Sequence, residues 1–374
     1  MRDKRVAVVG AGPAGAAAAI ALARAGVAVT LYEKSAWPRE KACGDGLTPA
    51  TVGELARLGL RAPGGLKLAT TRVSAPSETS FRGAWPAGEP DGTTCERREF
   101  DDALVRAAVA AGARFEPQTA VALEGEALRL RTPAGDHRSV PDAIVLAEGA
   151  TGGLAAHAGL PPHRLRLHAY RGYVETPADL PLEYGVHYAR EFLPGYAWIF
   201  PVEARRANVG AVLARRGDVR ARLAAWLGRS PLAARELGGR GATLSSGRGG
   251  IIPVGRARRT AGNVFAIGDA AGVADPLSAE GVSQSLASAR LFADAFVRGG
   301  GDPKTVAARY EPALRAFDDN AREALRMRAV FRVYAEPLVA LARWRPRLAA
   351  HVIATGYFPK HDASWFFGSI GALR

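Results

Sequence analysis

Residues 5–33, RVAVVGAGPAGAAAAIALARAGVAVTLYE, decide the fold, because a glycine-rich turn there joins a buried strand to a helix. The apolar run 5–9 predicts a strand of a parallel sheet, and the Ala- and Leu-rich stretch after the turn predicts a helix ending near Ala25. Gly26 marks the helix end, and residues 27–32 predict a second strand. This order of elements is typical of the start of a dinucleotide-binding fold.

The three glycines of the turn have different roles in such a fold. Gly10 permits a tight turn, Gly12 lets the backbone approach a pyrophosphate, and Gly15 allows the helix to pack closely on the strand. The first turn of the helix presents N–H groups and a positive dipole end to the phosphates. Glu33 follows the second strand, where a carboxylate accepts hydrogen bonds from the adenosine ribose. The nucleotide contacts predicted from this segment are Gly10, Gly12, Ala14, Gly15, Glu33 and Lys34.

Composition limits the classes of protein to which the chain can belong. With 374 residues and 48% hydrophobic content, it can bury the core of one large domain or of two ordinary ones. The formal net charge of +14 attracts anionic partners, but the arginines are scattered and form no basic block interleaved with aromatic residues. We therefore expect a solvated cationic surface, no nucleic-acid partner and no metal site.

Cysteine content and the length of the apolar runs bear on the compartment. Cys43 and Cys95 are the only two cysteines, too few for a disulfide scaffold, so a reducing cytoplasm is the expected location. The first residues, MRDKRVAVVG, contain no secretory signal, and Arg, Gly or Pro interrupts each apolar run before it could span a bilayer. The sequence predicts a cytoplasmic protein that is soluble or at most peripheral to a membrane.

A second motif, far along the chain, distinguishes between nucleotides. Residues 263–267 predict another buried strand, and residues 268–282, GDAAGVADPLSAEGV, lead into a helix predicted to extend to about Phe296. This motif resembles the second FAD motif of the aromatic-hydroxylase-like flavoproteins. The resemblance implies that Asp269 binds ribityl or ribose hydroxyls and that the helix N-terminus faces the flavin pyrimidine, where reduced flavin carries negative charge. The implied FAD contacts are Gly268, Asp269, Pro276, Glu280, Gly281 and Val282.

Two further elements between these motifs match the same superfamily. Residues 95–101, CERREFD, precede a helix predicted from about residue 101 to 111 and resemble the segment whose arginine contacts FAD, with Arg98 preferred over Arg97. A predicted strand at 143–147 is followed by Glu148 and Gly149, although Glu148 stands where these flavoproteins usually have Asp. Arg98, Glu148 and Gly149 are therefore added to the implied FAD contacts.

Two segments indicate which reaction a flavoprotein with these motifs would catalyse. They are residues 38–49, PREKACGDGLTP, and residues 195–201, GYAWIFP, which are followed by Asn208-Val209-Gly210. Together they resemble the geranylgeranyl reductase family of FAD-dependent oxidoreductases, and the resemblance covers roughly residues 5–300. That family includes archaeal lipid reductases, plant and bacterial geranylgeranyl reductases, and actinobacterial menaquinone reductases. The resemblance implies hydride transfer from flavin N5 to an isolated prenyl double bond, with NADPH, NADH or a protein electron donor as the reductant.

The first of these segments suits a flavin site by its own chemistry. Glycines flank Asp45, so the backbone can run close to a flat ring. Cys43 would then lie near the flavin, where its thiol could orient substrate or relay a proton to a carbanion-like carbon; alternatively, it is only a small buried hydrophobe. The predicted cofactor contacts of this segment are Arg39, Cys43, Gly44, Gly46 and Leu47.

The second segment predicts a strand with aromatic residues on one face. Alternation places Tyr196, Trp198 and Phe200 together. An aromatic wall suits a polyprenyl chain through apolar area and contact with alkene π electrons, but the same pattern also fits the core of an ordinary sheet. The candidate catalytic residues are Cys43, Tyr196 and Trp198.

The fold class that these patterns predict is α/β, with a Rossmann-type FAD-binding domain interrupted by other segments. We assign residues 1–68, 93–162 and 251–300 to this discontinuous domain. A mixed-sheet substrate domain comprises residues 69–92 and 163–250, with strands at 171–174 and 207–213. Residues 301–374 form a mainly helical C-terminal region, which is expected to become irregular near Pro346 and Pro359.

The C-terminal region suggests a second kind of contact. Residues 322–350 carry many arginines among Leu, Val, Phe and Trp, and could lie on an anionic membrane. The competing interpretation, a helix packed on its own domain with arginines facing water, is preferred, because Pro337 and Pro346 argue against one continuous surface helix. The expected substrate is a hydrophobic small molecule or an isoprenoid.

Other functions use the same FAD motifs. The main alternative is an FAD-dependent monooxygenase, a hydroxylase or an epoxidase, that acts on a hydrophobic small molecule. A halogenase is less favoured: residues 196–201, YAWIFP, only partly match the WxWxIP segment of halogenases, and only Lys41 and Lys67 are candidates for their lysine. A flavoprotein that merely senses redox state or binds lipid is ranked last, because it would need neither Cys43 nor the aromatic wall.

Overall fold

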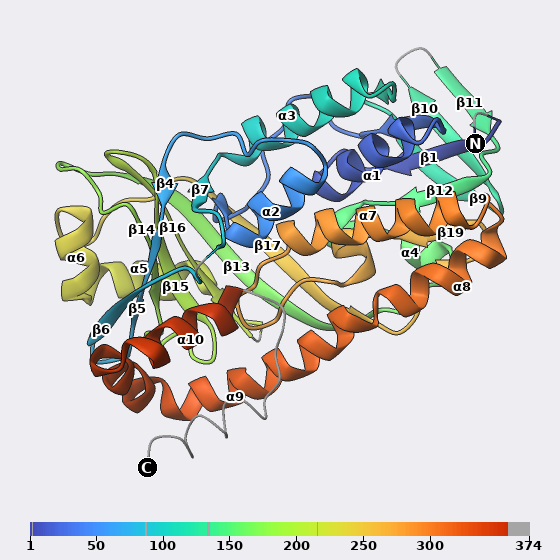
Figure 1. The fold of residues 1–374 in the computed structure, drawn as a ribbon. Helices are drawn as coiled ribbons and strands as arrows, with labels where there is room; N and C mark the ends of the chain where they lie inside the picture. Colours follow the sequence, from blue (N-terminus) through green and yellow to red (C-terminus); the bar gives the residue numbers. More distant parts are fainter. Residues whose placement is uncertain (2, 87, 133–134, 215, 358–374) are drawn as a thin grey trace.

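The fold has two large sheets at opposite ends of an elongated molecule, with helices along its length (Figure 1). The computed structural model describes residues 1, 3–86, 88–132, 135–214 and 216–357. The sequence-based fold class is confirmed, because a parallel nucleotide-type sheet and a mixed sheet are both present.

The first sheet has six strands in the order β18-β19-β12-β1-β2-β8, parallel except for the short β18–β19 pair. Its strands are β1 (Arg5–Val9), β2 (Ala28–Tyr32), β8 (Arg114–Glu116), β12 (Ala143–Leu146), β18 (Thr260–Ala261) and β19 (Val264–Ala266). Helices α1 (Pro13–Arg24), α3 (Arg97–Ala110) and α7 (Val282–Arg298) pack together on it. The alanines at 16–19 are completely buried, and their small side chains let the neighbouring helices approach α1 closely.

A three-stranded antiparallel sheet flanks this end of the molecule. It consists of β9 (Ala120–Glu124), β10 (Ala127–Thr132) and β11 (Gly135–Ser139), in the order β11-β10-β9. The short helix α4 (Leu154–His157) precedes β13, the first of the long strands of the second large sheet.

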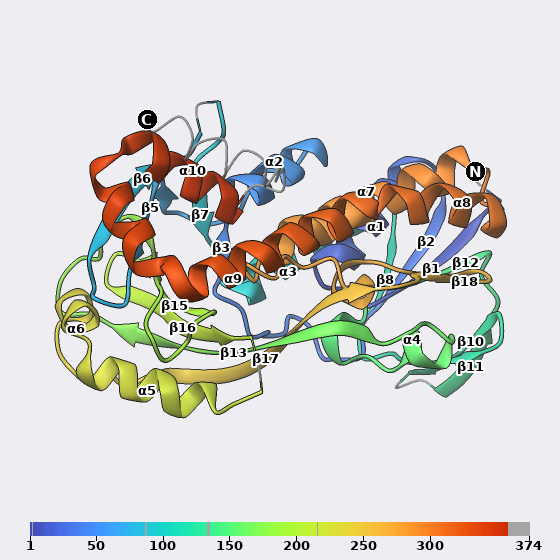
Figure 2. The same ribbon diagram turned by 90° about the horizontal axis from the view of Figure 1, so that it is seen from below.

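The second large sheet has seven strands in the order β17-β13-β16-β15-β14-β5-β6, all antiparallel except the β14–β5 pair. These strands are β5 (Thr70–Ser74), β6 (Ser80–Ala84), β13 (His163–Glu175), β14 (Glu183–His187), β15 (Tyr196–Glu203), β16 (Arg206–Leu213) and β17 (Ser245–Arg256). Helices α5 (Val219–Arg229) and α6 (Pro231–Leu237) cover one face, while the C-terminal helices lie on the other (Figure 2).

A small sheet lies between the two large ones. It pairs β3 (Gly46–Leu47) and β4 (Lys67–Leu68) with β7 (Gly92–Thr94), and α2 (Pro49–Arg57) follows β3. β17 spans residue 250, where we placed a domain boundary. In the first sheet, β12 lies between β1 and β19 and pairs with both of them. The two ends of the molecule are therefore joined through sheet structure as well as through loops.

Three helices form the described part of the C-terminal region: α8 (Pro303–Ala313), α9 (Arg315–Trp344) and α10 (Pro346–Tyr357). The expectation that Pro337 interrupts the helix was wrong, because α9 continues through it. Pro337 is on the exposed side of α9, where water can bind the carbonyl group that proline leaves without a partner. α10 begins directly at Pro346, a position that tolerates proline. Pro359 lies outside the described residues.

Candidate active site

The glycine-rich turn joins β1 to α1 in a conformation that needs glycine at two positions. Gly10 has a φ of +108°, and a Cβ atom there would lie 2.3 Å from the carbonyl oxygen of Ala147. A Cβ atom at Gly15 would lie 1.9 Å from the carbonyl oxygen of Gly10. The helix starts after Gly12 without a side-chain cap, so its first N–H groups have no capping side-chain partner.

Two arginines face the open side of this turn. A Cβ atom built on Gly12 would lie 3.6 Å from Nη2 of Arg39 and 4.0 Å from Nη2 of Arg97. Both guanidinium groups bind Asp101: Arg39 donates from Nη1 at 3.2 Å, and Arg97 donates from Nε and Nη2 at 2.7 and 2.9 Å. N–H groups and two cations around an open turn are the donors that a pyrophosphate needs.

Glu33 is an ionised acceptor beside the turn. Its carboxylate accepts hydrogen bonds from the N–H groups of Ala11 and Ser35 and from Nε of Arg39, at 3.3, 3.0 and 3.0 Å. Burial opposes ionisation, but Arg39 and the N–H donors outweigh it, so the pKa of Glu33 lies below its usual value. An ionised acid here can accept ribose hydroxyls. Lys34, the next residue, is exposed.

The arginine expected from sequence is on the wrong side of its helix. Arg98 is exposed, whereas Arg97 is 6% exposed and faces the turn. The reason is that α3 begins at Arg97, four residues earlier than predicted, and an i,i+4 ion pair with Asp101 supports its first turn. Successive helix positions point in different directions, so this early start turns Arg97 inward.

The second motif meets the first segment through Lys41. The ammonium nitrogen of Lys41 lies 3.7 Å from Oδ2 of Asp269, and a Cβ atom built on Gly149 would lie 3.2 Å from the same nitrogen. Gly268 adopts a φ of +57° and donates its N–H to Oγ of Ser288 in α7. Glu148 directs its carboxylate to the N–H groups of residues 154 and 155 and thereby caps α4.

The loop 275–281 before α7 is held from three directions. Arg328 of α9 donates to the backbone carbonyl oxygen of Pro276, and the hydroxyl of Tyr196 donates to the backbone carbonyl oxygen of Ser278. Glu280 accepts hydrogen bonds from Oγ1 of Thr48 and of Thr51, at 2.5 and 3.2 Å. Burial raises the pKa of Glu280 to about 6, although these hydroxyl groups lower it. Tyr196 thus fixes a loop in this structure.

The segment around Cys43 lies against the aromatic strand β15 and its neighbour β14. A Cβ atom on Gly44 would lie 3.3 Å from Nε1 of Trp198, and one on Gly46 would lie 3.1 Å from Cε1 of Tyr184. Along β15, the ring centroids of Tyr196 and Trp198, and of Trp198 and Phe200, are each 6.2 Å apart. The predicted aromatic face is therefore present, and it packs in the core beneath this loop.

Asn208 connects the loop to the strand. Its Nδ2 donates to the carbonyl oxygen of Cys43 at 2.9 Å and to Oδ2 of Asp45 at 2.7 Å, while its Oδ1 accepts from Nε1 of Trp198 at 2.9 Å. Cys43 is half-buried, and its sulfur contacts the Arg97 guanidinium and the backbone N–H of Asp45. Burial raises the pKa of the thiol, Arg97 lowers it, and the net shift is upward.

Several site residues were missed by the sequence analysis. Arg97, Lys41, Asp45, Tyr173 and Arg328 all contact the predicted motifs. Arg97 had been weighed against Arg98, and Lys41 had been considered only as a halogenase lysine. Asp45 lies in the segment 38–49 and Tyr173 in the predicted strand 171–174, but no role had been assigned to either. The pyrophosphate donors, the ionised Glu33 and the carboxylate of Asp269 together form a cradle that fits a dinucleotide such as FAD.

Comparison with known proteins agrees with this arrangement. Residues 3–163 match the family model described as FAD binding domain. The menaquinone reductase of Mycolicibacterium smegmatis is 33% identical over 317 residues, which cover 79% of this chain and 76% of that protein. Digeranylgeranylglycerophospholipid reductase 1 of Methanopyrus kandleri is 30% identical over 348 residues, covering 86% of this chain and 90% of that protein.

Solved structures share the fold. A geranylgeranyl bacteriochlorophyll reductase-like protein from Thermoplasma acidophilum has a TM-score of 0.80 at 20% identity, covering 96% of this chain and 97% of its own. The flavin-dependent halogenase CmlS has a TM-score of 0.76 at 26% identity, covering 92% of this chain and 67% of its own. Both of these reductases match this chain over three quarters or more of their own length. The chain belongs to the geranylgeranyl reductase family of FAD-dependent oxidoreductases.

Proposed function

We propose that this protein is an FAD-dependent reductase that saturates isolated double bonds of a prenyl chain, either a geranylgeranyl group or a menaquinone side chain. The observation that carries the proposal is the position of Cys43. Its sulfur contacts Arg97, which faces the glycine-rich turn, and the next residue of its loop, Gly44, packs against Trp198 of the aromatic strand β15. The printed names of the relatives, menaquinone reductase and digeranylgeranylglycerophospholipid reductase, support this substrate class.

The residues around the turn would bind the cofactor. Arg39, Arg97 and the first N–H groups of α1 would hold the pyrophosphate, and Glu33 would accept the ribose hydroxyls. Asp269 and the N-terminus of α7 would bind the flavin end. FAD, when bound, supplies the hydride, and the reductant that we propose for it is NADPH, NADH or a protein electron donor.

Cys43 would supply the proton. An isolated alkene accepts hydride poorly, so a proton must be available as the second C–H bond forms. Because burial raises the pKa of Cys43, the sulfur carries its proton at neutral pH. It is therefore suited to give a proton to the substrate rather than to act as a nucleophile. Tyr196 and Trp198 would hold the prenyl chain or the loops around it, and exclude water.

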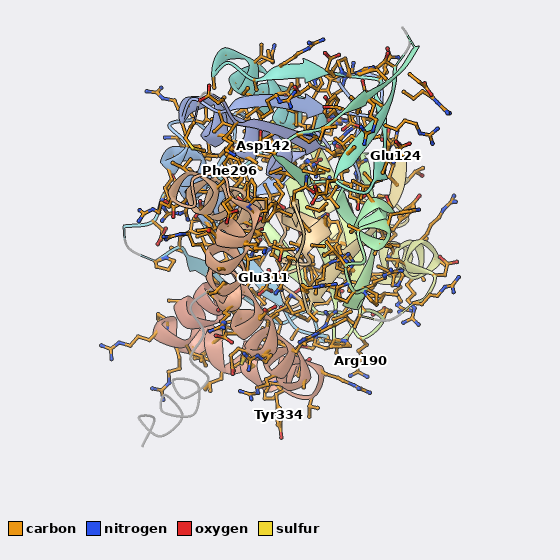
Figure 3. All side chains as sticks on the ribbon, turned by 90° about the vertical axis from the view of Figure 1, so that its right-hand side faces the viewer. Glu124, Asp142, Arg190, Phe296, Glu311 and Tyr334 are labelled. Carbon is orange, nitrogen blue, oxygen red and sulfur yellow. The ribbon has the colours of Figure 1, made fainter. Side chains whose placement is uncertain are left out.

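We also propose a peripheral membrane contact for the substrate end. Within the described ranges, no helix combines the length and apolarity needed to cross a bilayer. The outward face of α9, together with the start of α10, nevertheless exposes large apolar side chains and arginines. We call this face the α9 patch; its residues are Arg332, Val333, Tyr334, Leu341, Arg343, Trp344, Arg345 and Arg347. Tyr334 points away from the body of the molecule (Figure 3), as an interfacial residue would.

The decisive experiment measures product masses. Purified holoenzyme, reduced with dithionite, would be incubated with geranylgeranyl diphosphate or with menaquinone, once without oxygen and once in air. A gain of two hydrogens per bond without oxygen supports the reductase and identifies its substrate class. No anaerobic gain, with oxygen incorporated in air, would instead assign the protein to the monooxygenases.

The oxygenase alternative has two observations in its favour. CmlS, a halogenase, shares the fold at 26% identity, and Lys41 lies at Asp269 within the cofactor cradle. Lys67, the other lysine considered, is exposed on β4. The aerobic samples in the same experiment, with halide added, test this alternative directly.

A further inference from the structure

Arg328, on the inner face of α9, is a buried cation with few partners. It is 4% exposed, and its Nη1 donates to the backbone carbonyl oxygen of Pro276. Its Nε is buried without a hydrogen-bond partner, and the guanidinium group forms no ion pair with the described residues. Removing an isolated cation from water costs free energy, so the stability of the fold does not explain why this arginine is buried.

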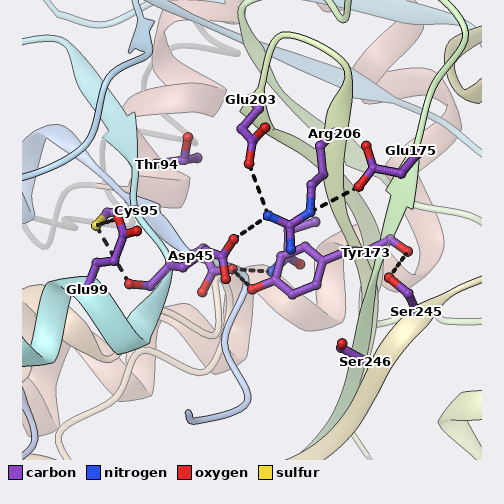
Figure 4. Close-up of polar contacts among 12 residues, drawn as sticks. Asp45, Thr94, Cys95, Glu99, Tyr173, Glu175, Glu203, Arg206, Ser245 and Ser246 are labelled. Carbon is purple, nitrogen blue, oxygen red and sulfur yellow. Dashed lines mark hydrogen bonds and ion pairs between the residues drawn. The ribbon is translucent and has the colours of Figure 1, made fainter. Parts of the chain in front are cut away.

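Other arginines at the candidate active site have acidic partners. Arg97 forms an ion pair with Asp101 at 2.7 Å. Arg206 pairs with Glu175 at 3.3 Å and with Glu203 at 3.1 Å (Figure 4). The arginine of α9 differs from these two, because its hydrogen bond goes to the backbone of a loop and not to a carboxylate.

The groups around the Arg328 guanidinium come from three places in the chain. Tyr188 follows β14, Tyr196 is the first residue of β15, and Asp275 begins the loop 275–281. Burial lowers the pKa of Arg328, and these three groups act in the opposite direction. Oδ1 of Asp275 accepts hydrogen bonds from the N–H groups two and three residues further along, each at 2.8 Å. This carboxylate therefore shapes the loop that the arginine contacts.

The same loop has an uncommon backbone conformation. Ala279 has a φ of 55°, in the left-handed region that residues other than glycine rarely adopt. A residue in this region keeps its conformation only where its surroundings hold it. The N–H of Asp275 donates to the carbonyl oxygen of Glu280 at 2.9 Å and closes the loop. Arg328 and Tyr196 reach in from other elements and hold carbonyl groups on the N-terminal side of Ala279.

The loop leads directly to the flavin side of the cofactor cradle. Gly281 precedes the first residue of α7, and a Cβ atom built on it would lie 3.3 Å from Oδ1 of Asp269. No side chain caps α7, so the N–H groups of its first turn have no capping side-chain partner. Asp269 and this helix end are the groups that we propose for the flavin end of FAD. Their relative position depends on the path of the loop.

We propose that Arg328 is a positioning residue for the flavin end of the cofactor. It holds the loop 275–281 so that the first turn of α7 and the carboxylate of Asp269 lie together. The positive end of α7 and the buried guanidinium charge then both favour negative charge at this side of the cradle. The C-terminal region thereby acts on the flavin site, although the FAD-binding family model covers only residues 3–163. This inference rests on the FAD part of the proposed function and not on the prenyl substrate.

The first measurement, on R328M, separates a positioning role from a structural one. Methionine is apolar and flexible enough to fill the space, and removing an unpaired buried charge should not destabilise the fold. We expect the urea midpoint of the R328M apoprotein to equal or exceed that of the wild type. A lower midpoint would assign Arg328 to the stability of the fold and overturn the inference.

The second measurement is the midpoint potential of the bound flavin, obtained by anaerobic dithionite reduction against a reference dye. Displacing the loop and removing the cation should make R328M favour reduced over oxidised flavin about tenfold less than wild type does, within the range of helix-terminus effects. For a two-electron couple, a tenfold change lowers the potential by about 30 mV. R328K keeps the charge and should stay closer to the wild-type potential. R326M, at an exposed arginine of the same helix, is the matched control and should leave the potential unchanged.

The potential alone decides the inference once the variant is folded. A wild-type potential in R328M overturns it. If R328M does not retain FAD, R328Q replaces it, because its neutral amide can still donate to the loop; a smaller shift in the same direction is then expected, and no shift overturns the inference. These measurements use no prenyl substrate. If the wild-type enzyme saturates no prenyl chain, the proposed substrate class fails and the positioning role of Arg328 is still decided by the potential.

Discussion

At the scale of single residues, the site depends on where a side chain is absent as much as on where one is present. Gly12 faces two arginines at ordinary contact distances, so a small side chain could be accommodated by the protein itself. The same space is where the pyrophosphate would lie. A substitution at Gly12 can therefore prevent cofactor binding without preventing the chain from folding.

Gly12→Val should abolish FAD binding while leaving a folded apoprotein, because its side chain would occupy the pyrophosphate position without meeting backbone. The measurement is the flavin-to-protein absorbance ratio together with the far-UV circular dichroism. Gly228→Val, at an exposed glycine of α5 with nothing near its Cβ position, is the control. Flavin retained by Gly12→Val at the wild-type ratio contradicts this placement of the cofactor.

Cys43→Ala should retain FAD but slow saturation by about a hundredfold or more, the range in which a positioned general acid acts. The measurement is the single-turnover rate with the substrate found by mass spectrometry. Cys95→Ala should leave this rate unchanged, because the Cys95 thiol contacts Glu96 and Glu99 rather than the aromatic strand. An unaltered rate in Cys43→Ala would leave that thiol with a packing role only.

The sequence predicted local features of the site better than long-range ones. Gly10, Gly12 and Glu33 belong to one continuous βαβ unit, so their spacing alone places them together. The choice between Arg97 and Arg98 failed because one helix position decides which side chain points inward. The contacts of Asp45 with Tyr173 and Asn208 join residues 128 and 163 positions apart, and no local pattern could pair them.

At the scale of secondary structure elements, α9 combines two surfaces. Its inner face packs against the second sheet through residues such as Phe331 and Val339, and Arg328 reaches the loop 275–281. Its outer face is the α9 patch. Sequence reasoning predicted the helical character of the region, but it wrongly expected Pro337 to interrupt the helix, because an exposed proline costs a helix less than a buried one.

Replacing Arg343 and Arg347 by Glu and Trp344 by Ser should weaken binding to vesicles that contain anionic phosphatidylserine. Each basic residue contributes about 1 kcal/mol at such a surface, so the triple change should reduce binding at least tenfold. Vesicle sedimentation at low and high salt measures this effect. Arg106→Glu, at an exposed arginine of α3, is the control. Equal sedimentation of the triple variant and the wild type rules out the α9 patch as a docking surface.

At the scale of the whole molecule, buried carboxyl groups link stability to pH. Asp45 has a folded pKa of about 6, above its value in an unfolded chain. At a pH below the pKa of Asp45 in the unfolded chain, this carboxyl group is protonated in both the folded and the unfolded state, so its burial does not oppose folding through ionisation. As pH rises towards the folded pKa, the unfolded state ionises first, so stability is lost between about pH 4 and pH 6.

Asp45→Asn should therefore gain stability relative to wild type as pH increases. Between pH 5 and pH 7.5 the difference in the free energy of unfolding should shift in its favour by about 1 kcal/mol. Urea titrations of both apoproteins at the two pH values measure it. A difference that is the same at both pH values would mean that Asp45 is ionised as easily in the fold as in the unfolded chain.

The long strands β13 and β17 have a consequence for engineering. They pair over most of their length, and their ends lie at the two opposite ends of the molecule (Figure 2). At the nucleotide end His163 contacts the carbonyl oxygen of Ala270, and at the other end Tyr173 reaches Asp45. A chimera that exchanged the substrate half at a junction near residue 163 or 250 would cut through this pair. Recombination between relatives should succeed only where both strands come from the same parent.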